Sequence, residues 1–180
     1  MGYPGGCAVM LKLPEGTCDV LHKAATAWSA GHDDWKVVHP RDYHLTLQFI
    51  GRDLNPEKIA SSICGVAMFA FSDDRAPQHL RLTGAFGAQI TKKGRYLVAR
   101  AMMDPLAIAR GQLRQFLRNM EVVPKDSFEF RPHVTLAEAP PSARVPGALP
   151  DPLSPFSVEY QELVVKYGPY RMTMQLAKKG

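Results

Sequence analysis

Long hydrophobic runs and cysteines are both scarce in this 180-residue sequence. No apolar run reaches the roughly 18 residues that a membrane-spanning helix requires. The first residues also lack the basic segment and long apolar stretch of a secretion signal. We therefore expect a cytoplasmic protein that binds no membrane. Only Cys7, Cys18 and Cys64 are present, an odd number without C-x-x-C spacing, which argues against a disulfide framework and against a zinc knuckle.

The sequence also lacks a strong excess of one charge. Lys and Arg number 22 against 17 Asp and Glu, which gives a formal charge of +5 and an isoelectric point near 9.2. This balance favours an anionic partner only weakly, because many proteins carry such a charge for solubility. Hydrophobic residues make up 46% of the chain and charged residues 22%, as in a soluble globular domain. The composition thus excludes a disordered tail, a collagen-like repeat and a coiled coil.

A weak internal repeat spans nearly half of the chain. The segment His-Leu-Thr-Leu at 44–47 recurs 89 residues later as His-Val-Thr-Leu at 133–136. At the same offset, the apolar segment 7–13 falls on 96–102, which is also apolar and of strand length. Two copies are too few for a solenoid, which needs three or more repeats. The repeat instead indicates two similar units packed around a pseudo-two-fold axis.

We predict a single domain over residues 1–180, with the repeated units at about 7–51 and 96–137. Within each unit, an apolar strand is followed by a helix with a proline at its start, Pro14 in the first unit and Pro105 in the second. The His-x-Thr segment then forms the second strand. Each unit is therefore predicted to run strand, helix, strand.

Three further segments are predicted outside this pattern. Asn55 and Pro56 begin another helix. Six prolines between 140 and 155 exclude a helix or a central strand there, so this segment is an exposed loop, either a lid over the substrate or a simple connection. Residues 156–165 and 170–177 are predicted to form a closing hairpin. With strands pairing locally and helices between them, the fold class is α+β with mostly antiparallel sheets.

The two His-x-Thr motifs carry the candidate chemistry. Alternate side chains of a strand share a face, so His44 points with Thr46, and His133 points with Thr135. If the pseudo-two-fold axis brings the strands together, two imidazoles and two hydroxyls surround one cleft. One neutral histidine can then take a proton from an attacking hydroxyl or water, while the other, protonated, donates to the leaving oxygen. The hydroxyls can hold the non-bridging oxygens of a phosphodiester, and no metal or other cofactor is required.

These motifs resemble the two-histidine (2H) phosphoesterase superfamily. The pattern is most similar to its LigT-like branch, the bacterial and archaeal RNA 2′,3′-cyclic phosphodiesterases first described as 2′-5′ RNA ligases. The resemblance implies a bilobal α+β fold with two sheets and flanking helices around a central cleft. It also implies that the two histidines form the acid–base pair and that Thr46 and Thr135 hold the phosphate. The residues that carry it are Trp35, Pro40, HLTLQFIG at 44–51, FRPHVTLA at 130–137, VMLKLP at 9–14 and GPYRMT at 168–173.

The sequence departs from this branch at one position. The branch usually continues the second motif with an arginine that helps to bind phosphate, whereas this chain has Glu138. Glu138 either faces away from the site or marks a different substrate. Arg131, two residues before His133, should share its strand face and is a candidate for supplying the missing positive charge. Among the aromatic residues beside the motifs, Tyr43 is a candidate for binding substrate.

The sequence thus predicts a phosphoric diester hydrolase that opens a 2′,3′-cyclic phosphate, or another 2′-linked phosphodiester, on an RNA end or a nucleotide. A second hypothesis keeps this chemistry but assigns a signalling oligonucleotide, either a 2′-5′ oligoadenylate or a cyclic oligonucleotide of antiviral defence. A third hypothesis is a nucleotide- or RNA-binding module without turnover, although a binder has no need of two intact His-Thr pairs. A zinc enzyme is disfavoured because two histidines without a third ligand are too few.

Overall fold

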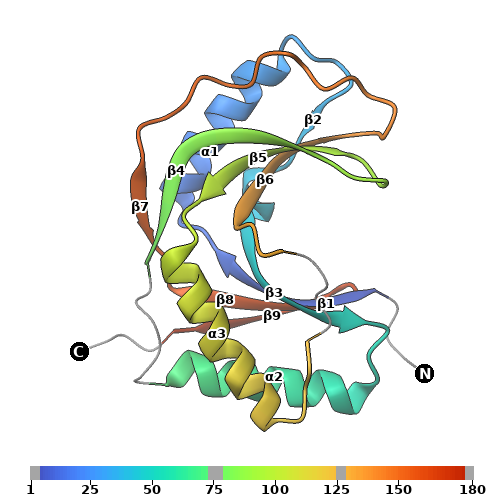
Figure 1. Cartoon of the computed structure of the whole chain (residues 1–180), viewed down its shortest axis with the longest axis vertical. Coiled ribbons are helices and arrows are strands. Elements are labelled where there is room, and N and C mark those ends of the chain that lie inside the picture. Colours follow the sequence, from blue (N-terminus) through green and yellow to red (C-terminus); the bar gives the residue numbers. More distant parts are fainter. Residues whose placement is uncertain (1–4, 73–78, 125–128, 177–180) are drawn as a thin grey trace.

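The computed structural model describes residues 5–72, 79–124 and 129–176. Within these ranges the chain forms nine strands, three α-helices and one short 3₁₀ helix, which confirms the α+β class (Figure 1). In chain order they are β1 (Gly6–Lys12), α1 (Glu15–Ser29), β2 (Lys36–Val37), η1 (Pro40–Asp42), β3 (His44–Arg52), α2 (Pro56–Phe71), β4 (His79–Ile90), β5 (Arg95–Ala101), α3 (Asp104–Asn119), β6 (His133–Ala139), β7 (Phe156–Glu159), β8 (Glu162–Tyr167) and β9 (Tyr170–Gln175).

The strands pair in the order β7-β4-β5-β6-β3-β1-β8-β9, with β2 added beside β6, and every pairing is antiparallel. The antiparallel prediction is therefore confirmed. The expected division into two sheets is not, because hydrogen bonds link all nine strands into one sheet. Its two halves meet at β3 and β6, where the register contains one pair, Leu45 with Val134.

The strand order has an approximate two-fold symmetry about that central pair. β6, β5 and β4 on one side correspond to β3, β1 and β8 on the other. The second strand and the helix of each half keep the 89-residue offset, since β3 and β6 begin at His44 and His133 while α1 and α3 begin at Glu15 and Asp104. The bounds of the first strands, β1 and β5, keep this offset as well. Their pairing differs by one residue, because Lys12 pairs with His44 whereas Arg100, and not Ala101, pairs with His133.

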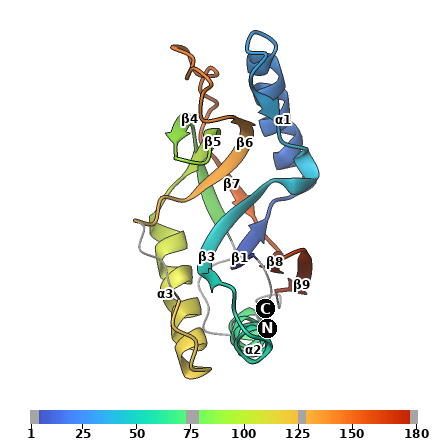
Figure 2. The ribbon, with the colours of Figure 1, turned by 90° about the vertical axis from the view of Figure 1, so that its right-hand side faces the viewer.

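The helices pack apolar faces that the sequence places at helical spacing. The helix predicted from Asn55 onward is confirmed as α2, and the side-chain oxygen of Asn55 accepts a hydrogen bond from the Lys58 backbone N–H at 2.8 Å. α2 packs against α3, while α1 lies at the opposite end of the molecule (Figures 1 and 2). No helix in the described ranges is both long and apolar enough to cross a membrane. The buried residues of α3 are Leu106, Ala109, Leu113 and Leu117.

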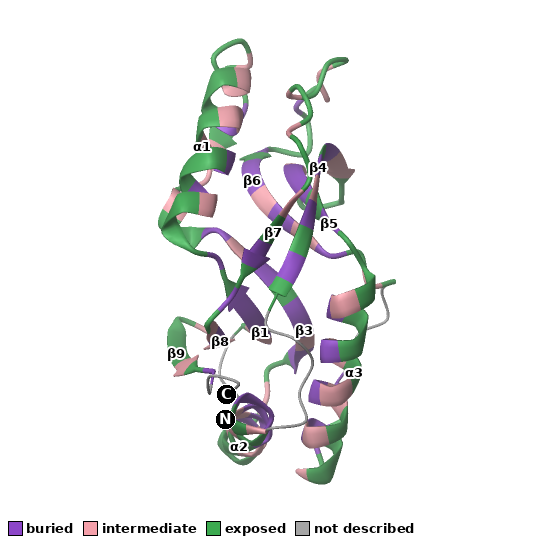
Figure 3. Ribbon diagram, turned by 90° about the vertical axis from the view of Figure 1, so that its left-hand side faces the viewer, coloured by how far each residue is buried: buried purple, intermediate pink, exposed green. Residues whose placement is uncertain are grey.

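Burial in the sheet follows the alternation of its strands (Figure 3). Leu45, Leu47, Val134 and Leu136 are each at most 1% exposed, so they anchor β3 and β6 in the core. The histidines and threonines between them face the other way. The closing hairpin is shorter than predicted, because residues 156–159 form β7 and pair with β4, leaving β8 and β9 as the hairpin.

The segment 140–155 contains no helix or strand, as its prolines predict, and it is held in place at several points. The indole N–H of Trp28 donates to the carbonyl of Ala148 at 2.9 Å, and that of Trp35 donates to the carbonyl of Arg144 at 3.4 Å. Near the end of the loop, the Leu153 N–H donates to the Gly84 carbonyl at 2.9 Å. These contacts favour a fixed connection over a lid that opens and closes.

Gly84 permits the last of these contacts, and we predict that Gly84→Ala destabilises the protein by about 1–3 kcal/mol. Gly84 has a φ of +76°, and a Cβ added there would lie 1.9 Å from the Leu153 carbonyl oxygen. The matched control is Gly111→Ala within α3, where an added Cβ meets nothing within 4 Å. Gly111→Ala should stabilise the helix by about 0.5–1 kcal/mol. Urea unfolding followed by tryptophan fluorescence measures both changes, and equal stabilities would contradict the assigned loop contact.

Candidate active site

The four polar groups of the His-x-Thr motifs gather around the single pair that joins the two half-sheets. Leu45 pairs with Val134 in antiparallel register, so the next positions place His44 across from Thr135 and Thr46 across from His133. Leu45 and Val134 are also counterparts in the repeat, so the pseudo-two-fold axis passes between them. The structure thus brings together the four residues that the sequence singled out. Thr46 is exposed and the other three are half-buried.

Both imidazoles are fixed in the same way. Nδ1 of His44 lies 2.7 Å from the carbonyl oxygen of Asp42, and Nδ1 of His133 lies 2.7 Å from the carbonyl oxygen of Arg131. A carbonyl can only accept a hydrogen bond, so each Nδ1 must carry the proton. In the neutral ring, Nε2 then keeps its lone pair. Each histidine therefore presents Nε2 as its reactive atom, and the backbone of its own chain selects this tautomer.

A β-bulge follows each His-x-Thr motif and brings one more residue to the site face. In β3 the register skips one residue after Thr46, and in β6 it skips one after Thr135. The skipped residue reverses the alternation, so Phe49 shares the face of Thr46 and Glu138 shares the face of Thr135. Glu138 therefore lies on the site face. Of the two alternatives for this residue, the one in which it faces away from the site does not hold.

A cavity of about 480 Å³ opens on the His44 half of this face. Lys166 of β8 brings an ammonium group to its wall, and the half-buried ring of Phe49 brings an aromatic surface. The sequence analysis did not identify Lys166 as a site residue. Its position depends on the pairing of β8 with β1, which no local sequence motif indicates. The full lining is Gly5, Gly6, Ala8, Met10, His44, Thr46, Phe49, Lys166 and Gly168.

The His133 half of the face has different neighbours. Arg100 is the register partner of His133 on β5. The side-chain amide of Gln89 on β4 lies 3.2 Å from Nδ1 of His133. Neither residue was identified from the sequence, because both reach the site through long-range strand pairing. Among the described residues, no three His, Cys, Asp or Glu side chains form a group that could hold a metal ion.

The surroundings of His44 favour its neutral form. Burial lowers the pKa of His44 below its ordinary value, and the positive charges of Lys166 and Arg171 act in the same direction. The Asp42 carbonyl and carboxylate oppose this shift without cancelling it, although Arg171 also donates to the Asp42 carboxylate at 3.2 Å. His44 is therefore mostly neutral at pH 7, the form that can accept a proton.

Comparison with solved structures agrees with this architecture. TT0787 of Thermus thermophilus is 22% identical, with a TM-score of 0.69 over 96% of each chain. E. coli LigT complexed with 3′-AMP is 20% identical, with a TM-score of 0.61 over 97% of this chain and 96% of its own. The chain has the LigT fold. Kluyveromyces marxianus Usb1 is 15% identical, with a TM-score of 0.60 over 96% of this chain and 99% of its own. No family model and no curated protein matches the sequence.

Within this LigT fold, the two candidate substrate-binding residues occupy different environments. The Arg131 guanidinium is exposed and pairs with the Glu129 carboxylate at 2.6 Å. Tyr43 is only 1% exposed, and its hydroxyl lies 3.5 Å from the Leu136 carbonyl and 3.3 Å from Nδ1 of His22. The prediction that Tyr43 binds substrate is therefore corrected: Tyr43 adjoins His44 along the chain, so its side chain points to the opposite, buried side.

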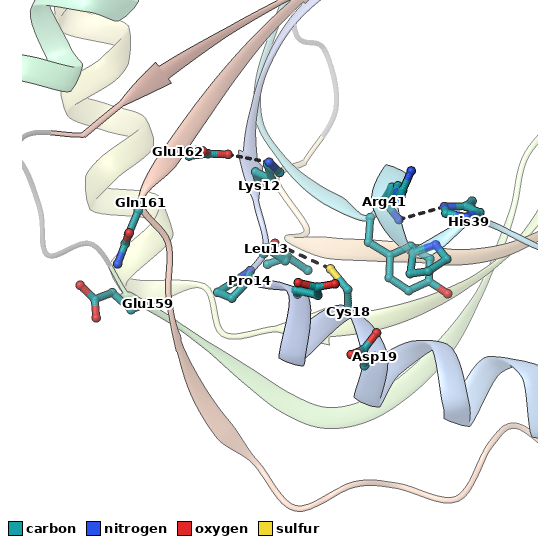
Figure 4. Close-up of a pocket in the computed structure, with 13 residues that line it drawn as sticks. Lys12, Leu13, Pro14, Cys18, Asp19, His39, Arg41, Glu159, Gln161 and Glu162 are labelled. Carbon is teal, nitrogen blue, oxygen red and sulfur yellow. Dashed lines mark hydrogen bonds and ion pairs between the residues drawn. The ribbon is translucent and has the colours of Figure 1, made fainter.

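A larger cavity, of about 680 Å³, lies elsewhere in the structure. Neither the two histidines nor the two threonines of the His-x-Thr motifs line it. It lies beside the start of α1 and η1 (Figure 4). The Lys12 ammonium in its wall is paired with the Glu162 carboxylate at 2.8 Å. The remaining charges are mostly acidic, so this cavity is a poor site for a phosphate. Its carboxylates belong to Glu15, Asp19, Glu159 and Glu162.

The environment of His44 leads to a prediction about its titration. We expect its pKa to lie below the ordinary histidine value of about 6.5, and Lys166→Met to raise it because a nearby positive charge is removed. Nitrogen-detected NMR titration of the imidazole measures this and also reports whether Nδ1 carries the proton. Lys23→Met, on the exposed side of α1, is the matched control and should leave the titration unchanged. A His44 pKa at or above the ordinary value would contradict the described environment.

Proposed function

We propose that this protein is a phosphodiesterase in which His44 and His133 act as the acid–base pair. The observation that carries the proposal is their identical fixation, with each Nδ1 held by a backbone carbonyl and each Nε2 left available on one face. Histidines that serve only packing have no need to be held in the same tautomer on both sides of a pseudo-two-fold axis. This arrangement supplies one proton acceptor and one proton donor to a single substrate.

The proposed reaction is the opening of a 2′,3′-cyclic phosphate by water. Neutral His44 takes a proton from the water at Nε2 while the water oxygen bonds to phosphorus. The bond between phosphorus and the 3′ oxygen breaks, and protonated His133 gives its Nε2 proton to that oxygen, which leaves a 2′-phosphate. The pseudo-two-fold axis suits this chemistry because the entering and leaving oxygens lie roughly in line across phosphorus.

The threonines and the cavity support the same reaction. The hydroxyls of Thr46 and Thr135 can donate hydrogen bonds to the non-bridging oxygens, where negative charge increases in the transition state. Lys166 adds a positive charge on the His44 side, and the ring of Phe49 offers a stacking surface for a nucleobase. Solved structures of LigT contain 3′-AMP or phosphate, so the fold accommodates such ligands. We therefore propose an RNA end or a nucleotide as the substrate class.

A second candidate keeps the chemistry and changes the substrate to a 2′-5′ linked or cyclic signalling oligonucleotide. The position of Glu138 favours it. Glu138 lies on the face of Thr135, at the position where the LigT-like branch usually has a phosphate-binding arginine, and this difference favours a substrate other than the RNA end that the branch usually takes.

Product analysis separates these substrates and tests the proposed function. We expect the purified protein, with chelator present, to convert 2′,3′-cyclic nucleotides to 2′-phosphates only. Cleavage of 2′-5′ oligoadenylates or of cyclic di- and trinucleotides would instead favour the second candidate. Chromatography against authentic standards identifies the products. Absence of turnover on the whole panel would leave a nucleotide-binding module as the better description.

The histidine pair predicts the effect of single substitutions. His44→Ala and His133→Ala should each lower kcat about 10²- to 10⁴-fold, the usual contribution of a general acid or base. His79→Ala, at the exposed start of β4, is the matched control and should retain full activity. Steady-state kinetics measures all three, and circular dichroism verifies folding. If only one of the two substitutions lowers kcat, the paired mechanism is wrong.

The same pair predicts the pH dependence of the wild-type enzyme. kcat/KM should follow a bell-shaped curve, because one histidine must be neutral while the other is protonated. Its acidic limb should lie below pH 6.5, in line with the lowered pKa of His44. A profile with one titrating group would argue against the two-histidine assignment.

A further inference from the structure

Each histidine has a cation directly across from it on the neighbouring strand. In the strand register, Lys12 of β1 lies opposite His44, and Arg100 of β5 lies opposite His133. Side chains that pair directly across antiparallel strands lie on one face, about 5 Å apart at Cβ. Lys12 and Arg100 are therefore counterparts in the two halves, and both emerge on the face that carries the histidines.

The two cations differ in what they contact. The Lys12 ammonium is paired with the Glu162 carboxylate at 2.8 Å, and this contact lowers the pKa of Glu162. The Arg100 side chain is exposed, and none of the ion pairs found among the described residues involves it. The positive charge of Lys12 is thus balanced by the Glu162 carboxylate. The positive charge of Arg100 instead faces solvent beside the site.

The backbone of β4 makes room for the Arg100 guanidinium. A Cβ added at Gly87 would lie 2.8 Å from Nε and 3.0 Å from Nη2 of Arg100, so the guanidinium rests directly on this glycine. Gly87 pairs with Val98, which pairs with Thr135, and the three residues form one row across β4, β5 and β6. The guanidinium therefore lies on the site face, beside the row of Thr135.

In this structure the guanidinium lies away from the expected position of the reacting phosphate. That phosphate belongs at the pseudo-two-fold axis, between β3 and β6, whereas the guanidinium rests on β4. With strands spaced by about 4.8 Å, β4 lies roughly 12 Å from the axis. In this conformation the threonine hydroxyls are the groups placed to hold the reacting phosphate, and the Arg100 guanidinium lies further out, on the Gly87 side.

We propose that Arg100, resting on Gly87, is a second phosphate-binding subsite on the His133 side of the cleft. It binds a phosphate of the substrate other than the one that reacts, so the enzyme takes an oligonucleotide in preference to a mononucleotide. This inference rests on the proposed function, since it places the reacting phosphate between the two histidines. Through Arg100, the affinity of the enzyme depends on the number of phosphates in the substrate and therefore on the length of the substrate.

Binding measurements test this subsite without requiring turnover. The His44→Ala/His133→Ala double variant is titrated calorimetrically with 3′-AMP, which has one phosphate, and with the dinucleotide ApAp, which has two. Adding Arg100→Ala should raise the dissociation constant for ApAp about 10-fold or more, the usual effect of losing a charge-assisted hydrogen bond. The dissociation constant for 3′-AMP should change less than twofold. An equal loss on both ligands, or no loss on ApAp, overturns the proposal.

Companion variants separate charge from structure. Arg100→Lys should retain part of the preference for ApAp, and Gly87→Ala should weaken it because the new methyl group displaces the guanidinium. Lys12→Ala, which removes the counterpart cation already paired with Glu162, should leave the preference unchanged. Thermal unfolding verifies that each variant is folded. If the wild-type protein turns over no phosphodiester but the ApAp preference still depends on Arg100, the proposed function fails while the subsite stands.

Discussion

The backbone pairing of Leu45 with Val134 is the contact on which the rest of this structure depends. It is the one register pair that links β3 to β6, and both side chains are fully buried beneath the sheet. Because the two residues are counterparts in the repeat, the histidine, the threonine and the bulge around Leu45 recur around Val134. A shift of one residue in this pairing would turn both histidines into the core, since the side-chain period of a strand is two. The apolar residues below the sheet thus fix the position of the polar groups above it.

The pairing of Leu45 with Val134 also means that the backbone itself positions most groups of the site. A backbone carbonyl two residues before each histidine sets its tautomer, and a bulge after each threonine adds Phe49 on one side and Glu138 on the other. The backbone is nearly symmetric, whereas the side chains on it are not. Lys12 and Arg100 occupy equivalent positions, yet one is paired with a carboxylate and the other rests on a glycine. A symmetric frame therefore carries a site with two different halves, one with an aromatic ring and Lys166 and the other with an exposed arginine.

Much of the fold and the centre of the site could be predicted because the signals are local. The His-x-Thr spacing, the cap at Asn55 and the prolines of 140–155 each act within a few residues, and the structure places them as the sequence indicates. Tyr43 was predicted wrongly, although strand alternation beside His44 already pointed it inward. Lys166, Arg100 and the orientation of Glu138 could not be predicted in this way. They depend on which strands pair and in what register, and a bulge cannot be placed before that register is known.

The order of the strands along the chain has a consequence for synthesis. β1 lies between β3 and β8, and β8 is near the end of the described chain, so the first half of the sheet lacks one of its inner strands until almost all of this sequence has been made. Until β8 has been made, the edge of β1 that faces β8 is unpaired, and unpaired strand edges can bind other strands. Pairing across such a long sequence separation is also slow, because a large loop must close first. The nascent protein therefore cannot complete its first half independently, and the free edge of β1 has to stay clear of other strands until β8 emerges.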